Sequence, residues 1–106
     1  MISPLEKKVL CDLKNNLRAL TGEVEVHLFG SRARGDNEPD ADYDILIVVP
    51  DLTKELKSKI RDIVWQAGFD NDMFISSLIV SRAQWQEGPL RVSPLKKAIE
   101  REGLPV

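Results

Sequence analysis

The most constraining feature of the sequence is an unbroken apolar run, Ile45 to Val49, that follows Asp44 directly. A strand with one solvent-exposed face alternates apolar and polar residues, whereas both faces of this run are apolar. Such runs are typical of strands that are covered on both sides, as in the centre of an α/β sheet. We therefore predict a buried strand over residues 43–49.

The patterns on either side of this run indicate strands that alternate with helices. A helical turn is expected from a Ser81 cap through Trp85, and Gly103 is expected to stop the last helix. Helical spacing of apolar residues and helix caps predict helices over residues 3–20, 52–67 and 94–102. Alternation predicts further strands over residues 23–29 and 72–80. This order predicts one α/β domain over residues 1–106, with helices packed on a sheet.

The first helix has a well-marked start. Ser3 is placed to cap it, Pro4 occupies the first helical position, and Glu6 completes a capping box. The apolar stripe predicted for this helix consists of Leu5, Val9, Leu13, Leu17 and Leu20.

Composition excludes several classes of partner. The net charge is −2 and the isoelectric point is near 5.4, whereas proteins that hold a nucleic-acid backbone carry a basic surplus, so we expect no DNA partner. No apolar run approaches the roughly 20 residues that span a bilayer, so no membrane association is expected. The single cysteine, Cys11, and an N-terminus without a signal-peptide pattern predict a cytoplasmic protein.

A Gly-Ser turn and two aspartates frame the buried strand. Gly30 and Ser31 follow the preceding strand, where glycine permits a tight turn and the amides that begin a short helix favour an anion. Asp42 and Asp44 share one face at the start of the buried strand, roughly 7 Å apart along the backbone. Two carboxylates this close repel, and Mg²⁺ binds such pairs together with phosphates and water. The pattern predicts a metal site next to a phosphorylated ligand.

Arg32 and Arg34 follow the turn and have the chemistry to clamp phosphate oxygens. The alternative, above all for Arg34, is an ion pair with Asp36 or Asp40 inside a structural loop.

Together these pieces read Gly-Ser, ten residues, then Asp-x-Asp, with a strand on each side. This arrangement resembles the signature of the nucleotidyltransferases of the DNA polymerase beta superfamily. The stretch HLFGSRARGDNEPDADYDILIVV is most similar to the minimal nucleotidyltransferases, small single-domain proteins of bacteria and archaea. Residues 75–106 also resemble the C-terminal strand and helix of that group. Ala41 stands where serine is frequent in the family.

The resemblance implies a nucleotidyltransferase fold, a small mixed β-sheet with helices packed on it, that uses two Mg²⁺ ions and ATP. It implies transfer of AMP to a hydroxyl, here a tyrosine of a HEPN-domain toxin that an antitoxin of this kind silences. The alternatives are a non-catalytic nucleotide-binding module that neutralises its partner by contact, and transfer to a small molecule such as an aminoglycoside. The residues implied are Asp42 and Asp44 for catalysis and metal, and Gly30, Ser31, Arg32 and Arg34 for the nucleotide.

Members of the superfamily usually place a third acid on the next strand, where it binds the catalytic metal and helps to deprotonate the acceptor hydroxyl. The resemblance therefore implies a third, catalytic carboxylate, and this role is predicted for Asp72. Asp72 opens the alternation Asp72, Phe74, Ser76, Leu78, which would fix its direction. The alternative is Asp70, in the preceding loop, or no role for either acid.

Three further residues are worth following. Trp65 lies off the apolar stripe of its helix and is a candidate partner contact, unless a loop or the last helix covers it. His27 is predicted to be a solvent-side strand residue, and Cys11 a surface thiol without a catalytic role.

Overall fold

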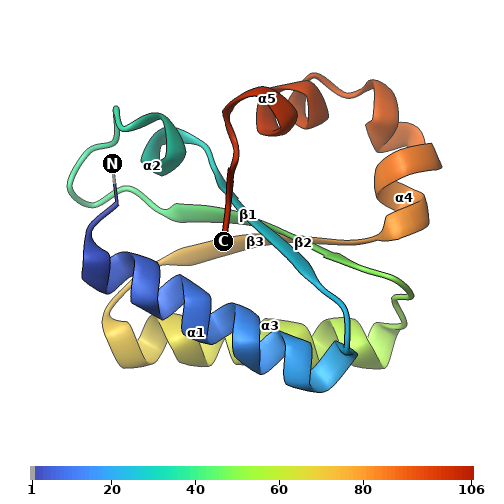
Figure 1. Ribbon diagram of the computed structural model, residues 1–106, viewed down its shortest axis with the longest axis horizontal. Coiled ribbons are helices and arrows are strands. Elements are labelled where there is room, and N and C mark those ends of the chain that lie inside the picture. The colour runs from blue at the N-terminus through green and yellow to red at the C-terminus, as the bar shows by residue number, and fades with distance from the viewer. Residues whose placement is uncertain (1) are drawn as a thin grey trace.

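A four-stranded mixed sheet forms the centre of the computed structural model, which describes residues 2–106 (Figure 1). Its strand order is β3-β2-β1-β4. β2 is parallel to β3 and antiparallel to β1, and β4 adds antiparallel to the other edge of β1. The strands are β1 (Glu25–Phe29), β2 (Tyr43–Val49), β3 (Ile75–Ser81) and the unanticipated β4 (Leu104–Pro105). The predicted α/β class with a small mixed sheet is confirmed.

Helices cover both faces of the sheet, as the apolar run in β2 predicts. α1 (Pro4–Thr21) and α3 (Lys54–Asn71) pack on one face, and α4 (Arg82–Glu87), η1 (Pro89–Val92) and α5 (Pro94–Glu102) lie on the other (Figure 1). Alternate residues of β2 therefore enter two separate cores. Ile45, Ile47 and Val49 join the α1–α3 side and are fully buried, each contributing roughly 1.5–3 kcal/mol. Leu46 and Val48 face α4 and α5.

The first helix begins as predicted but buries a shifted face. The Ser3 hydroxyl accepts from the Glu6 N–H, and the Glu6 carboxylate accepts from the Ser3 N–H, so both halves of the capping box are present. The buried side chains are Val9, Leu10, Leu13 and Leu17, whereas the two ends of the predicted stripe, Leu5 and Leu20, are exposed. Leu5 instead borders the open groove between α1 and α3, and Leu20 lies in the last turn of the helix.

The second long helix, α3, runs four residues beyond its predicted end, to Asn71. Its last turns lie close to the start of β3, and Gly68 makes this possible. A Cβ at Gly68 would lie 2.6 Å from the carbonyl oxygen of Met73, closer than any side chain permits. Asp72 is the C-cap of this helix, and the chain enters β3 at Ile75.

The C-terminal third follows the predictions with small shifts. Ser81 caps α4, which extends to Glu87, and the short 3₁₀ helix η1 follows it. Gly103 follows α5 as predicted. None of the described helices combines the length and the apolar character that crossing a membrane requires.

Candidate active site

The Gly-Ser turn lies against the second aspartate of the Asp-x-Asp pair. Phe29, the last residue of β1, is opposite Asp44 in the antiparallel ladder, so the turn that follows reaches the Asp44 side chain. Gly30 has φ +75° and ψ −157°, a combination that only glycine adopts without strain. A Cβ at this position would lie 2.6 Å from Oδ2 of Asp44. The glycine is therefore required both by the turn and by the carboxylate beside it.

A single helical turn, α2 (Ser31–Arg34), starts at this glycine. The N–H groups of Ala33 and Arg34 both donate to the carbonyl oxygen of Gly30, each at 3.1 Å. Gly30 is the N-cap and Ser31 the first helical residue, so the predicted cap position of Ser31 is off by one. The amides of Ser31 and Arg32 precede these bonds at the start of the turn, where backbone N–H groups attract anions.

Asp42 and Asp44 lie at the start of β2 on the side of the sheet opposite α1 and α3. Asp42 is exposed and Asp44 is half-buried. Burial raises the pKa of Asp44, the negative charge of Asp42 raises it further, and the nearby Arg34 guanidinium opposes both. The two carboxylates thus interact as like charges, as the alternation along the strand predicts.

Arg34 joins the turn to the C-terminal helix. Its Nε is 3.1 Å from a carboxylate oxygen of Asp36, and its NH1 is 3.3 Å from Oε2 of Glu102 in α5. The ion pair with Asp36 is the predicted alternative to a phosphate contact of Arg34. Arg34 nevertheless is exposed and close enough to Asp44 to influence its titration, so it can exchange these partners for an anion.

Arg32, for which a phosphate clamp is predicted, is bonded to the loop between α2 and β2. Its NH2 donates to the carbonyl oxygens of Pro39 and Ala41, at 3.1 and 2.9 Å, and its Nε donates to Ala41 as well. The guanidinium also stacks over the Tyr43 ring, 4.1 Å from the centroid. With these groups engaged, Arg32 fixes the segment that leads to Asp42. The structure therefore indicates a positioning role for it.

Sequence reasoning missed two residues that support this loop. The Tyr43 hydroxyl donates to Oε2 of Glu6, and Arg32 lies 3.7 Å from the same carboxylate oxygen. The bond from Tyr43 lowers the pKa of Glu6, and burial together with this carboxylate raises the pKa of Tyr43. Glu6 thus serves both as the capping-box residue of α1 and as an anchor for the start of β2.

The structure contradicts the placement predicted for Asp72. Asp72 ends α3 with φ +54°, and β3 begins three residues later, so the strand does not direct its side chain. The β3 residue in register with Asp44 is Ser76. Across residues 2–106, no three acidic, histidine or cysteine side chains meet in a metal-binding group. Asp72 therefore does not join Asp42 and Asp44.

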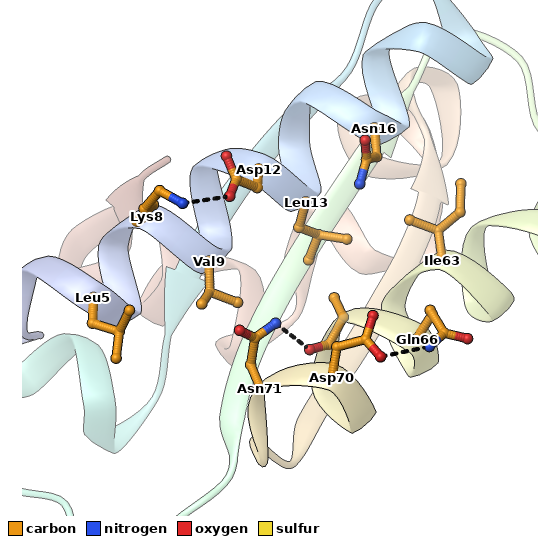
Figure 2. Close-up of a pocket in the computed structure, with 11 residues that line it drawn as sticks. Leu5, Lys8, Val9, Asp12, Leu13, Asn16, Ile63, Gln66, Asp70 and Asn71 are labelled. Atoms are coloured by element: carbon orange, nitrogen blue, oxygen red, sulfur yellow. Dashed lines mark hydrogen bonds and ion pairs between the residues drawn. The ribbon is translucent and has the colours of Figure 1, made fainter.

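The alternative third acid, Asp70, lies in a different place again. Its carboxylate accepts from Nε2 of Gln66 at 2.7 Å, in a groove of about 440 Å³ between α1 and α3 (Figure 2). This groove is on the face of the sheet that α1 and α3 cover, whereas Asp44 lies on the other face. It is therefore separate from the Gly-Ser turn and the paired aspartates.

The donor set fits a divalent cation. Within residues 2–106 neither Asp42 nor Asp44 takes part in an ion pair, and the half-buried carboxylate of Asp44 is destabilised by its neighbour's charge. A cation between them would relieve this repulsion, and two carboxylates with phosphate and water oxygens are a usual ligand set for Mg²⁺.

Comparisons with known proteins agree with this geometry. Residues 10–101 match the family model of the nucleotidyltransferase domain. Over 83 residues the chain is 34% identical to a Methanocaldococcus jannaschii protein named "Putative protein adenylyltransferase", an alignment that covers 77% of this chain and 78% of the relative.

Two solved structures share the fold. A "putative nucleotidyltransferase" from Sulfolobus solfataricus superposes with a TM-score of 0.60 over 92% of this chain and 76% of its own. A toxin-antitoxin structure with AMP-PNP gives a TM-score of 0.56 over 89% and 69%. Both are 17% identical to this chain, so these likenesses concern the fold alone.

Fold, site and relatives define a nucleotide-transferring enzyme. The chain belongs to the nucleotidyltransferase domain family, and the resemblance to its minimal members is confirmed.

Proposed function

We propose that this enzyme transfers AMP from ATP to a hydroxyl group of a partner protein, a tyrosine of a HEPN-domain toxin. The observation that carries the proposal is the contact between the Gly30 turn and Asp44. It puts an anion-attracting backbone next to two carboxylates that form no ion pair within residues 2–106. The relative named as a protein adenylyltransferase and the toxin-antitoxin neighbour support the choice of acceptor. The HEPN partner and the tyrosine rest on the family resemblance.

The reaction requires an acceptor oxygen to attack the α-phosphorus of ATP. An oxygen–phosphorus bond forms, the bond to the oxygen that bridges to the β-phosphate breaks, and pyrophosphate leaves with that electron pair. The hydroxyl proton passes to water or to a carboxylate at the site. Bound Mg²⁺ would neutralise phosphate charge during this exchange.

Each residue of the site has a part in this scheme. The amides of Ser31 and Arg32 would hold phosphate oxygens at the start of α2, and Asp42 and Asp44 would hold the metal. Arg34 exchanges Asp36 or Glu102 for a phosphate oxygen. Arg32 keeps the loop before Asp42 in place through the carbonyls of Pro39 and Ala41. A second Mg²⁺ ion would take its remaining ligands from the triphosphate, water or the acceptor protein.

Titration calorimetry and a labelling assay test the proposal together. Asp42→Asn and Asp44→Asn should each weaken Mg·ATP binding at least tenfold, because each removes a carboxylate from the metal. Asp40→Asn is the matched control, since Asp40 is an exposed acid of the same loop. Wild-type protein incubated with α-labelled ATP, Mg²⁺ and the HEPN-domain neighbour should label that neighbour, and replacing the acceptor tyrosine by phenylalanine should prevent it.

The same assay separates catalysis from neutralisation by contact. If the partner is inhibited equally by wild type and by Asp44→Asn, without any label, the chain acts as a binding module and the transfer proposal fails. Asp72→Asn belongs in the same series. If Asp72 is catalytic, this variant should lose transfer. Because Asp72 lies at the end of α3, away from Asp42 and Asp44, we expect the variant to label the partner as fully as wild type does.

A further inference from the structure

Three exposed aromatic side chains gather where α3 ends and β3 begins. Trp65, Phe69 and Phe74 are 65%, 70% and 76% exposed, so neither a loop nor α5 covers Trp65. The rings of Trp65 and Phe69 stack with their centroids 5.1 Å apart. All three side chains line one groove of about 370 Å³, together with Asp72. We call these four residues and Arg61 the α3 surface.

The α3 surface is larger than an isolated exposed residue would explain. An aromatic side chain presents about 150–250 Å² when free, so these three leave on the order of 400 Å² of apolar area exposed. Monomeric proteins seldom expose continuous apolar patches beyond a few hundred Å² without a binding function. A standard interface buries about 800 Å² per partner, of which this patch would supply the centre and the polar neighbours the rim.

Charged residues flank the aromatic pair in an order that is self-complementary. Arg61 lies one helical turn before Trp65 on α3, and Asp72, the C-cap of α3, lines the same groove as Trp65 and Phe69. Both are exposed, and within residues 2–106 neither has an ion-pair partner. The helix therefore presents, in sequence, a cation, two stacked rings and an anion.

We propose that the α3 surface is a two-fold interface between two copies of this chain. A two-fold axis across α3 makes the two helices antiparallel, and each residue pair then occurs twice. Arg61 and Asp72 share nearly the same midpoint on the helix as Trp65 and Phe69. One axis at that midpoint brings Arg61 opposite the second copy's Asp72 and Trp65 opposite its Phe69. A parallel pairing would instead bring like charges together.

The surface is also placed where a second copy can approach. β3 is an edge strand of the sheet and lies next to α3, whereas α4 and α5 occupy the other face (Figure 1). Phe74 leads directly into that edge strand.

Sedimentation equilibrium measures the association directly. Wild type should form dimers with a dissociation constant on the order of 10 μM, as expected for a small interface. Trp65→Ala should be monomeric at ten times that concentration. Val92→Ala is the matched control, because Val92 is an apolar side chain of similar exposure, 67%, on η1.

Charge reversal provides the sharper test. Arg61→Glu and Asp72→Lys alone should each weaken self-association about tenfold or more, because both pairs across the axis become repulsive. An equimolar mixture of the two variants should form heterodimers with near wild-type affinity, because both pairs are then attractive. Any strain of a lysine at the positive φ of Asp72 is equal in monomer and dimer, so it does not enter the association constant.

Two results would overturn the proposal. One is a wild-type protein that remains monomeric throughout, including one whose α3 surface proves to bind the HEPN-domain partner instead. The other is a mixture of the two reversed variants that associates no better than either variant alone.

Discussion

A side chain at Gly30 would collide with the carboxylate of Asp44, since its Cβ would lie 2.6 Å from Oδ2. Gly30→Ala should therefore destabilise the fold by about 1–3 kcal/mol, because φ is +75°, and should also displace Asp44 and reduce Mg·ATP affinity. Gly22→Ala is the control. Gly22 has φ +79° but open space around its Cβ position, so that variant should lose stability and keep nucleotide binding. Equal nucleotide affinity in both variants would show that the contact with Asp44 is unimportant.

Asp44→Asn should have opposite effects on stability and on binding. Burial and the charge of Asp42 raise the pKa of Asp44, so the ionised carboxylate destabilises the metal-free fold at neutral pH. Without Mg²⁺, removing the charge should therefore raise the melting temperature. The gain in the free energy of unfolding should be at most about 1 kcal/mol, because solvent screens the charge of this half-buried group. With Mg·ATP present the wild type should become the more stable protein. Thermal denaturation under the two conditions should show this reversal, and a variant that melts earlier in both would contradict it.

Replacing each arginine of α2 by lysine should show that Arg32 and Arg34 have different roles. Arg32→Lys loses the forked bonds to Pro39 and Ala41, so it should cost about 1–3 kcal/mol and speed hydrogen exchange in residues 36–42. Arg34→Lys changes only exposed ion pairs, so it should leave the melting temperature nearly unchanged while weakening ATP binding. If Arg32→Lys instead reduces ATP affinity with the loop still protected from exchange, the original prediction of a phosphate ligand is correct.

Acid should loosen the contact between α1 and β2. The bond from Tyr43 lowers the pKa of Glu6 below its ordinary value of 4.5, so the ionised carboxylate stabilises the fold. That contribution is complete above the ordinary value and is lost as the pH falls through the lower folded-state pKa. Urea titrations should therefore show Glu6→Gln less stable than wild type at pH 7, with the gap closing below pH 4.5. A gap that is constant down to acid pH would indicate a packing effect.

Most of the framework was predictable because its causes are local. The absence of alternation in "ILIVV" identified a strand buried on both sides, and Ser3 with Glu6 identified the start of α1. Gly30 and the Asp-x-Asp pair were predictable because turn geometry and strand alternation follow directly from residue type.

The rest depends on contacts that residue types do not reveal. The partners of Arg32 are carbonyl oxygens, which every residue has. The bond between Tyr43 and Glu6 joins positions 37 residues apart, and the pair Arg34–Glu102 joins positions 68 apart. Asp72 was misplaced because the alternation read in β3 continues, by coincidence, into the end of α3.

The two-residue strand β4 has a consequence for assembly. β4 occupies the outer edge of β1, is very short and contains Pro105, which has no N–H to donate, so a further strand gains little by adding there. Repeated head-to-tail addition, β3 of one molecule to the opposite edge of the next, is thereby blocked. The two-fold pairing proposed for the α3 surface is closed by its own symmetry, so with strand addition blocked at β4 a small protein with an exposed aromatic surface is protected from polymerising into fibres.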